Sequence, residues 1–306
     1  RPLIIYGNGW ALDAKGYSRI FNITGANVTF VNVRFINGNA SGKYNDGVYN
    51  GGAIYWSGAN GAVNNCSFVD NYAERGGALY LNESASNYKI SDCKFRQNDA
   101  DTFGGAIDCY APKMNLTNTL FDKNTADTGA ALCREITATG GFGNYNNFTS
   151  NIAKTNGSAL AWISAENINI NHYIFIDNVA GYSGGAIYVG QGSGNCVVNN
   201  SYFRGNNVTN VTGGHGGAIE WYAGNGTVLN STFIDNHAHD GGAIYVGHGS
   251  EEINISESTF RINTAGTKGG AVSIEASKVT INASDFYDNS ATYGGALYVG
   301  GSGNLN

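Results

Sequence analysis

Residues 233–246 read Phe-Ile-Asp-Asn-His-Ala-His-Asp-Gly-Gly-Ala-Ile-Tyr-Val, and close copies of this stretch recur along the chain. It combines two motifs: a Phe with Asn three residues later, and a double Gly followed by Ala and an aliphatic residue. Recurrence at a fixed period is the signature of a repeat protein, in which each repeat forms one structural unit. The length of the period decides which kind of repeat protein this is.

The double-Gly motif returns every 25 to 32 residues, with a mean of about 27. Its first Gly stands at Gly51, Gly76, Gly104, Gly129, Gly157, Gly184, Gly216, Gly241, Gly269 and Gly294, and two copies are degenerate, with Ala130 and Ser158 in place of the second Gly. The Phe motif begins at Phe68, Phe95, Phe121, Phe148, Phe175, Phe203, Phe233, Phe260 and Phe286. Propeller blades need about 40 residues, and the leucine pattern of leucine-rich repeats is absent. A β-helix is the architecture that remains.

The segments around the motifs alternate between apolar and polar residues, as in residues 253–255 (Ile-Asn-Ile) and 187–189 (Ile-Tyr-Val). Such short alternation predicts half-buried strands. We therefore predict an all-β fold, a single-stranded right-handed parallel β-helix (solenoid) of about eleven coils with about 27 residues per coil. Residues 1–306 are expected to form one domain, and both ends look like the interior of a longer repeat array, so we expect a fragment of a longer protein.

Stacked coils place equivalent residues in ladders about 4.8 Å apart. We expect the Phe ladder in the core and the Asn ladder at a corner, where stacked amides bond to one another and to the turn backbone. The double Gly would supply backbone conformations closed to other residues, or room for close approach. Turn residues are predicted at Asp70, Asp177, Asp235 and Asp288, and core residues at Trp56, Trp162 and Trp221.

The composition excludes several classes of partner. The formal net charge is −6 and Lys and Arg do not cluster, so no nucleic-acid partner is expected. No apolar run approaches 18 residues, so we expect no membrane span in this segment. The five Cys include no C-x-x-C pair, and we expect no cofactor.

The pairing of both motifs once per coil resembles the repeats of chlamydial polymorphic membrane proteins. The fuller sequence, including residues 51–56 (Gly-Gly-Ala-Ile-Tyr-Trp) and 64–68 (Asn-Asn-Cys-Ser-Phe), is similar to adhesin-like surface proteins of methanogenic archaea. This resemblance implies an extracellular, cell-surface protein that acts in attachment and is not an enzyme. Its implied partners are glycans or proteins of a neighbouring cell, or copies of itself.

One position of the repeat, four residues after the first Gly, accepts both Tyr and charged residues, which predicts that it faces solvent. A strip of exposed Tyr on a flat sheet face suits binding to sugar rings or to another protein. The alternative is that Tyr is simply a favourable strand residue. The candidate ligand-binding residues are Tyr55, Tyr80, Tyr188, Tyr245 and Tyr298.

A candidate metal site involves His215, His239 and Asp240. His215 and Asp240 each precede a double Gly on neighbouring coils, so they should stack, with His239 beside them. Imidazole and carboxylate groups together suit a metal ion or an acid/base pair. The alternative is that these are polar residues of a surface turn.

Two covalent features are also predicted. Cys66 and Cys93 share a repeat position, so stacking puts them within disulfide range, although a ladder of free buried thiols is the alternative. Fifteen N-x-Ser/Thr sequons suit a secreted glycoprotein. The candidate glycosylation sites include Asn22, Asn82, Asn115, Asn156, Asn207, Asn225 and Asn254.

Two other functions stay open from the sequence. Exposed strand edges at both ends could stack copies into a structural fibre or coat. A polysaccharide-active, pectate-lyase-like enzyme is the second alternative, because many right-handed β-helices cleave acidic polysaccharides. Such enzymes gather acidic and basic residues from adjacent coils, whereas Asp108 and Glu220 lie four coils apart.

Overall fold

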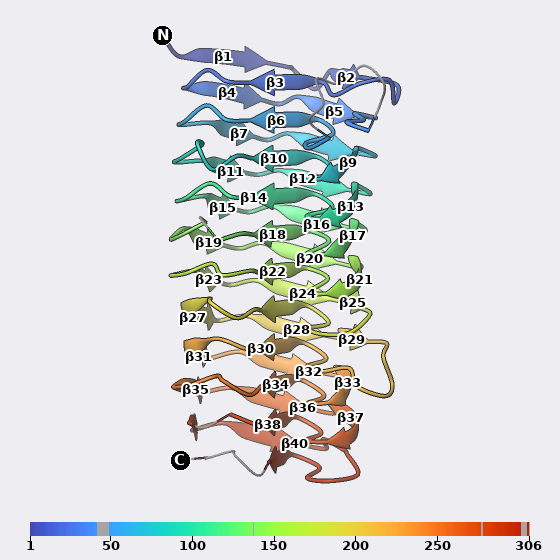
Figure 1. Ribbon diagram of the computed structural model, residues 1–306, viewed down its shortest axis with the longest axis vertical. Helices are drawn as coiled ribbons and strands as arrows, with labels where there is room; N and C mark the ends of the chain where they lie inside the picture. Colours follow the sequence, from blue (N-terminus) through green and yellow to red (C-terminus); the bar gives the residue numbers. More distant parts are fainter. Residues whose placement is uncertain (42–48, 137, 277, 301–304, 306) are drawn as a thin grey trace.

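The structure is a computed structural model that describes residues 1–41, 49–136, 138–276, 278–300 and 305. All the regular secondary structure within these ranges is β-strand. The described residues contain no helix that is long and apolar enough to cross a membrane. Figure 1 shows the coils stacked into one rod with β1 at one end and β40 at the other. The predicted parallel β-helix of about eleven coils with about 27 residues per coil is confirmed. Its right-handed sense is the one that the sterics of parallel crossover connections favour.

The strands form three parallel sheets of eleven strands and a fourth of eight. Sheet A contains β1 (Leu3–Tyr6), β4 (Val28–Val31), β7 (Ala62–Asn64), β11 (Lys89–Ser91), β15 (Asn115–Thr117), β19 (Phe142–Asn144), β23 (Asn169–Asn171), β27 (Gly194–Asn199), β31 (Gly224–Leu229), β35 (Ile253–Ser256) and β39 (Val279–Asn282). Sheet B contains β2 (Ala11–Asp13), β5 (Arg34–Ile36), β8 (Ser67–Val69), β12 (Lys94–Arg96), β16 (Leu120–Asp122), β20 (Asn147–Thr149), β24 (Ile174–Ile176), β28 (Tyr202–Arg204), β32 (Thr232–Ile234), β36 (Thr259–Arg261) and β40 (Asp285–Tyr287).

Sheets C and D complete each coil. Sheet C contains β3 (Phe21–Ile23), β6 (Ile54–Trp56), β10 (Leu79–Leu81), β14 (Ile107–Cys109), β18 (Leu132–Arg134), β22 (Leu160–Trp162), β26 (Ile187–Val189), β30 (Ile219–Trp221), β34 (Ile244–Val246), β38 (Val272–Ile274) and β41 (Leu297–Val299). Sheet D contains β9 (Tyr72–Arg75), β13 (Asp99–Phe103), β17 (Thr125–Thr128), β21 (Ile152–Asn156), β25 (Val179–Ala180), β29 (Asn207–Val208), β33 (His237–Asp240) and β37 (Thr264–Lys268). From the third coil onward, the chain passes through most coils in the order A, B, D, C.

Two sharp corners in each coil depend on single residues with a left-handed backbone. The corner between sheets A and B uses, for example, Asn65 with φ of 51°. The corner that follows sheet B uses Asp70, Asp177, Asp235 and Asp288, with φ between 53° and 56°. Asn and Asp tolerate this conformation better than other non-Gly residues, which confirms that these four Asp are turn residues.

The core is built around a continuous stack of Phe rings. From Phe35 to Phe286, consecutive rings of the Phe motif lie 4.6–5.1 Å apart between centroids and within 15° of parallel. This spacing matches the separation of stacked strands, so one ring per coil forms an unbroken column. Trp56, Trp162 and Trp221 are at most 1% exposed, which confirms that they belong to the core.

The Asn of the Phe motif forms the predicted corner ladder. Asn178 shows the pattern: its Nδ2 donates to Oδ1 of Asn206 at 2.9 Å and to the carbonyl of Phe148 at 3.0 Å. Its Oδ1 accepts from both the backbone N and the Nδ2 of Asn151, at 3.1 and 2.9 Å. Each amide therefore ties together three coils in a buried position.

Geometry favours both glycines of the double-Gly motif, although Ala130 and Ser158 occupy the second position in two copies. The first Gly of each copy has φ between 57° and 69°, which side-chain-bearing residues adopt at a cost. At most second-Gly positions the next coil lies very close: a Cβ on Gly185 would lie 1.9 Å from the carbonyl oxygen of Gly217. Both of the expected roles are therefore present, one at each Gly.

The predicted Cys66–Cys93 disulfide is absent from this structure: both residues are free thiols, and both are buried. They belong instead to the alternative, a ladder of small polar side chains. The N–H of Cys66 donates to the sulfur of Cys93 at 3.4 Å, and the N–H of Cys93 donates to Oγ1 of Thr119 at the same distance. The five cysteines of the chain are all buried free thiols.

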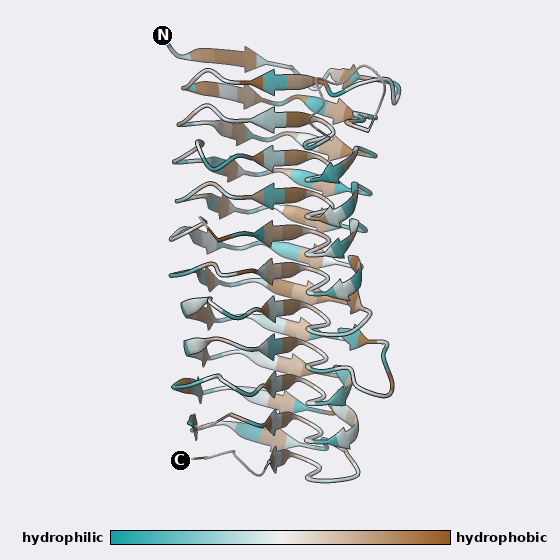
Figure 2. Ribbon diagram, viewed as in Figure 1, coloured by the Kyte–Doolittle hydropathy of each residue, from teal (hydrophilic) through white to brown (hydrophobic). Residues whose placement is uncertain are grey.

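Sheet D does not share the main core. A separate small cluster of Ala100, Ala126, Ala130 and Ala153 lies beneath it. The residues of sheet D are more hydrophilic than those of sheet C, as Figure 2 shows at the edge of the rod occupied by β9, β13 and β33. The double-Gly turn connects each strand of sheet D to the following strand of sheet C. These turns therefore lie beside the outer face of sheet C.

Candidate functional site

The strands of sheet C carry one row of side chains that alternate with the core residues. Ile187 and Val189, which flank Tyr188, both belong to the main core, so the middle side chain points to the other face of the sheet. The parallel register aligns this position from coil to coil. We call it the outer row, and in chain order it consists of Asn22, Tyr55, Tyr80, Asp108, Cys133, Ala161, Tyr188, Glu220, Tyr245, Ser273 and Tyr298.

The expectation that this row is a solvent-exposed strip is wrong. Tyr80 and Tyr245 are 8% and 6% exposed, and Tyr55, Tyr188 and Tyr298 are half-buried. The polar members of the row, such as Asp108 and Glu220, are buried as well. The tyrosines still stack in register as predicted, and their role as ligand-binding residues stays a prediction.

The row is covered because the double-Gly turns lie beside it. A Cβ on Gly129 would be 2.9 Å from Cβ of Cys133. The residue before the double Gly then extends over the row, as two examples show. The ring of His215 stacks on that of Tyr245 with centroids 4.1 Å apart, and Nζ of Lys268 lies 4.9 Å from the ring centre of Tyr298.

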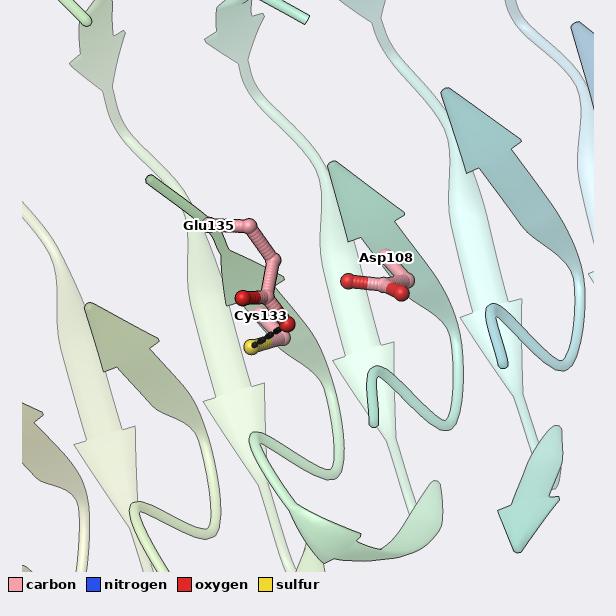
Figure 3. A group of neighbouring side chains, drawn as sticks. All are labelled: Asp108, Cys133 and Glu135. Carbon is pink, nitrogen blue, oxygen red and sulfur yellow. Dashed lines mark hydrogen bonds between the residues drawn. The ribbon is translucent and has the colours of Figure 1, made fainter. Parts of the chain in front are cut away.

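The most highly charged part of the row is a group that we call the Asp108 cluster: Arg75, Asp108, Cys133 and Glu135. Arg75 ends β9, Asp108 lies in β14 and Cys133 in β18, so three consecutive coils contribute. Nε of Arg75 donates to Oδ2 of Asp108 at 2.7 Å, and its Nη2 donates to Oε1 of Glu135. Sγ of Cys133 lies 3.7 Å from the same Oε1. Figure 3 shows the carboxylate of Glu135 folded back toward Cys133, with Asp108 on the adjacent strand.

Burial dominates the electrostatics of this cluster. The Asp108 side chain is fully buried, and burial raises its pKa to about 8 against the opposing attraction of Arg75. Its Oδ1 is buried and has no hydrogen-bond partner among the described residues. Burial likewise raises the pKa of the Cys133 thiol well above its usual value. The cluster thus places two carboxyl groups and a thiol around one guanidinium, which itself lies 4.5 Å from the ring centre of Phe103.

A second group of ionisable side chains lies four strands further along sheet C. Nδ1 of His215 lies 3.0 Å from Oε1 of Glu220, whose carboxyl group is buried. Burial raises the pKa of Glu220 above its usual value, while the contact with His215 opposes the rise. Tyr222 follows β30, and burial raises its pKa to about 12. Asp108 and Glu220 are four coils apart, as the sequence indicates.

The three residues of the predicted metal site do not converge. His215 and Asp240 do pair across neighbouring coils, as expected from the repeat. However, His215 turns toward Glu220, while Nδ1 of His239 lies 3.4 Å from Oδ1 of Asp240. Among the described residues, the group with three ligand atoms within 4.8 Å of one another is Asp108, Cys133 and Glu135.

The predicted glycosylation sites lie on the surface of the rod. The exposed ones are Asn22, Asn115, Asn225 and Asn254, and the half-buried ones are Asn82, Asn156 and Asn207. All seven positions therefore reach solvent at least in part. Whether any of them carries a glycan stays a prediction.

Sequence reasoning missed Arg75 and Glu135. It considered Asp108 alone because Glu135 lies two residues beyond the equivalent position and Arg75 lies before the double Gly. The signal that could have found them is the register itself. Two positions of the repeat flank the outer row: the residue before the double Gly, such as Arg75, and the residue six after its first Gly, such as Glu135. Charged residues at these two positions can therefore contact charged residues of the row.

Comparison with known proteins agrees with the repeat architecture. Residues 173–190 and 230–247 match the repeat family described as Chlamydia polymorphic membrane protein repeat. The chain is also 30% identical over 153 residues to the metabotropic glutamate receptor-like protein R of Dictyostelium discoideum. That match covers 50% of this chain but only 9% of the Dictyostelium protein. The similarity to polymorphic membrane protein repeats confirms that part of the predicted resemblance.

Proposed function

We propose that this chain is a rod-shaped segment of an extracellular, cell-surface adhesin-like protein that acts in attachment. The observation that carries the proposal is that the repeated residues of each coil have structural roles. The repeated Phe, Asn and Gly residues form the core, the corner ladder and the turns, as Phe175, Asn178 and Gly185 illustrate. What varies between coils is the outward-facing surface, which a stiff rod can present to a partner.

The surface location rests on similarity and on chemistry. The repeats of the chlamydial polymorphic membrane proteins, and the resemblance to adhesin-like proteins of methanogenic archaea, favour a place on the cell surface. The relative from Dictyostelium is named as a receptor-like protein, which suits the same setting. Sequons that reach solvent along the rod are compatible with glycosylation outside the cell.

The binding surface that we favour is centred on Tyr188. Its neighbours in the outer row are Ala161 and Glu220, and a Cβ on Gly190 would lie 2.9 Å from Cε1 of the Tyr188 ring. Small residues therefore surround a half-buried aromatic ring, with a buried carboxyl group on the next coil. An accessible aromatic face beside polar groups suits the stacking and hydrogen bonding of a sugar ring. We propose a cell-surface glycan as the ligand.

The test is binding of the full chain to a glycan array and to whole cells, comparing wild type with Tyr188→Ala. We expect Tyr188→Ala to weaken binding at least about 10-fold, which corresponds to about 1.4 kcal/mol. Tyr287→Ala is the matched control, because Tyr287 is 52% exposed on sheet B and should leave binding unchanged. If Tyr188→Ala binds as tightly as Tyr287→Ala, a site at Tyr188 is refuted. If the ligand proves to be a protein or a second copy of this chain, the choice of a glycan is refuted.

We also propose that the chain is not an enzyme, although adjacent coils do bring acidic and basic groups together. A carboxyl group that protonates or attacks a sugar must reach it, whereas Asp108 is fully buried and Glu220 is 1% exposed. The buried cluster therefore supports a structural role rather than pectate-lyase-like cleavage. Release of shorter products from acidic polysaccharides by the wild type, lost in Asp108→Asn, would contradict this.

A further inference from the structure

We propose that Asp108, Cys133 and Glu135 form a binding site for one divalent cation of the zinc class. Sequence comparison and the surface function both leave this cluster without a role, and the inference is independent of the proposed attachment. One candidate ligand atom from each of the three residues lies within 4.8 Å of the other two. All three residues are buried, so the site is isolated from solvent.

The geometry of the thiol and one carboxylate already matches a metal site. Zinc binds sulfur at about 2.3 Å and carboxylate oxygen at about 2.1 Å, so two such ligands at a tetrahedral angle lie about 3.6 Å apart. Sγ of Cys133 donates a hydrogen bond to Oε1 of Glu135 at 3.7 Å, so a zinc ion that replaced the thiol proton would require little change in this separation. The third ligand, from Asp108, comes from the adjacent strand of the same sheet and extends toward this pair (Figure 3).

An unsatisfied polar atom points to the same conclusion. Oδ1 of Asp108 is buried without a hydrogen-bond partner among the described residues, while Oδ2 is bonded to Arg75. Leaving a buried acceptor unpaired costs about 1–3 kcal/mol, and more for a charged group. A cation at Oδ1 would remove this cost without disturbing the contact to Arg75.

The balance of charge favours one divalent cation. Without a cation, Arg75 supplies one positive charge to the two carboxyl groups that it contacts. With the cation bound, Asp108 and Glu135 are ionised and Cys133 has lost its thiol proton to solvent. Three negative charges then face three positive ones, two on the cation and one on Arg75. The site is neutral, as a buried site must be to avoid a large desolvation cost.

Arg75 acts as a positioning residue. It holds Asp108 through Nε and Glu135 through Nη2, and so sets the orientation of two of the proposed ligands. Outer partners of this kind fix ligand geometry and are worth about 10- to 100-fold in metal affinity. The thiolate selects soft or borderline cations such as Zn²⁺, Cd²⁺ and Co²⁺ over Mg²⁺ and Ca²⁺, which require mainly oxygen ligands.

The test uses Co²⁺ as a spectroscopic probe with the purified full chain after treatment with a chelator. We expect one equivalent of Co²⁺ to bind, with a sulfur-to-cobalt charge-transfer band, and Zn²⁺ to displace it. Since the thiol proton is released, affinity should rise with pH. Cys133→Ser should abolish the charge-transfer band and lower Zn²⁺ affinity by more than about 100-fold, because a direct ligand is worth more than an outer partner.

Two variants keep the result interpretable. Cys109→Ser is the matched control, since Cys109 is equally buried but belongs to the main core, and it should leave the band unchanged. Asp108→Asn keeps the shape of the side chain and should also lose binding, which tests the site if Cys133→Ser fails to fold. The proposal is overturned if the wild type takes up no stoichiometric Co²⁺, or if uptake is lost in His215→Ala with His239→Ala but kept in Cys133→Ser and Asp108→Asn.

Discussion

Replacing one Asn in the middle of the corner ladder should destabilise the rod far more than replacing an Asn of similar appearance on its surface. The perturbation is Asn178→Ala. The side chain of Asn178 is fully buried and makes hydrogen bonds to the coil before it and the coil after it. The matched control is Asn171→Ala, because Asn171 also bonds to Asn side chains of both neighbouring coils, Asn144 and Asn200, but is half-buried at the end of β23.

The magnitude follows from the groups that lose their partners. Asn178→Ala leaves the backbone N–H of Asn151, one Nδ2–H of Asn151 and the carbonyl of Phe148 without their bonds of 3.1, 2.9 and 3.0 Å. Each of these three unpaired buried groups costs about 1–3 kcal/mol, so the expected loss is about 3–9 kcal/mol. At Asn171 water can replace the lost partners, and the expected loss is about 1 kcal/mol or less.

The assay is urea unfolding followed by fluorescence of the buried tryptophans, such as Trp162 and Trp221. Both the midpoint and the slope should be recorded, because stacked repeats can unfold in parts and a changed slope reveals this. Losses that agree within 1 kcal/mol for the two variants would refute the reasoning. They would mean that buried ladder bonds contribute no more than exposed ones.

Three further predictions concern the core, the turns and the response to pH. Phe175→Ala should cost about 3–5 kcal/mol in the same unfolding assay, because it leaves a cavity between two rings at 5.1 and 4.6 Å; a cost below 2 kcal/mol would mean that the column closes up. Gly185→Ala should cost more than Gly249→Ala in the same unfolding assay, because its Cβ would lie 1.9 Å from a carbonyl oxygen and the neighbouring coil must shift to accept it, although the equivalent positions hold Ala130 and Ser158. Gly249→Ala meets no atom within 4 Å and should cost about 1–2 kcal/mol for its positive φ; equal costs for the two variants would contradict this. Burial raises the pKa of Glu220 above its unfolded value of 4.5, so the folded state binds the proton more tightly than the unfolded state. The free energy of unfolding should therefore fall as the pH rises above about 4.5. Urea unfolding across this pH range checks it, and an equal fall in Glu220→Gln would contradict it.

The sequence was sufficient for the fold because the evidence is local and repeated. A Phe ring, a turn residue such as Asp177 and the ladder residue Asn178 recur within four residues in nine consecutive coils, from Phe68 to Asn289, and each has one conformational or packing role. The period then fixes which residues stack. Corner, core and turn roles could therefore be assigned before any coordinates were considered.

The candidate site was predictable only in part. Register places Asp108 beside Cys133 and His215 beside Asp240, and both pairings could be expected from spacing. The orientation of His215 toward Glu220 could not, because it depends on rotamers and on competition between carboxyl groups within reach. The disulfide was equally undetermined, since stacking at strand distance permits either a bond or a ladder of free thiols.

The sequence by itself therefore determined the repeating unit: its strands, its corners and the identity of its ladders. Only the tertiary structure decided what is exposed on the outside of sheet C. The alternation of apolar and polar residues predicts that Tyr80 and Asp108 point away from the core. It does not predict that the turn of a neighbouring coil covers them. The physical reason is that burial of the outer row depends on side chains such as Arg75, which lies 33 residues before Asp108 and in a different column of the repeat. Contacts between columns arise only when the coils are stacked in three dimensions.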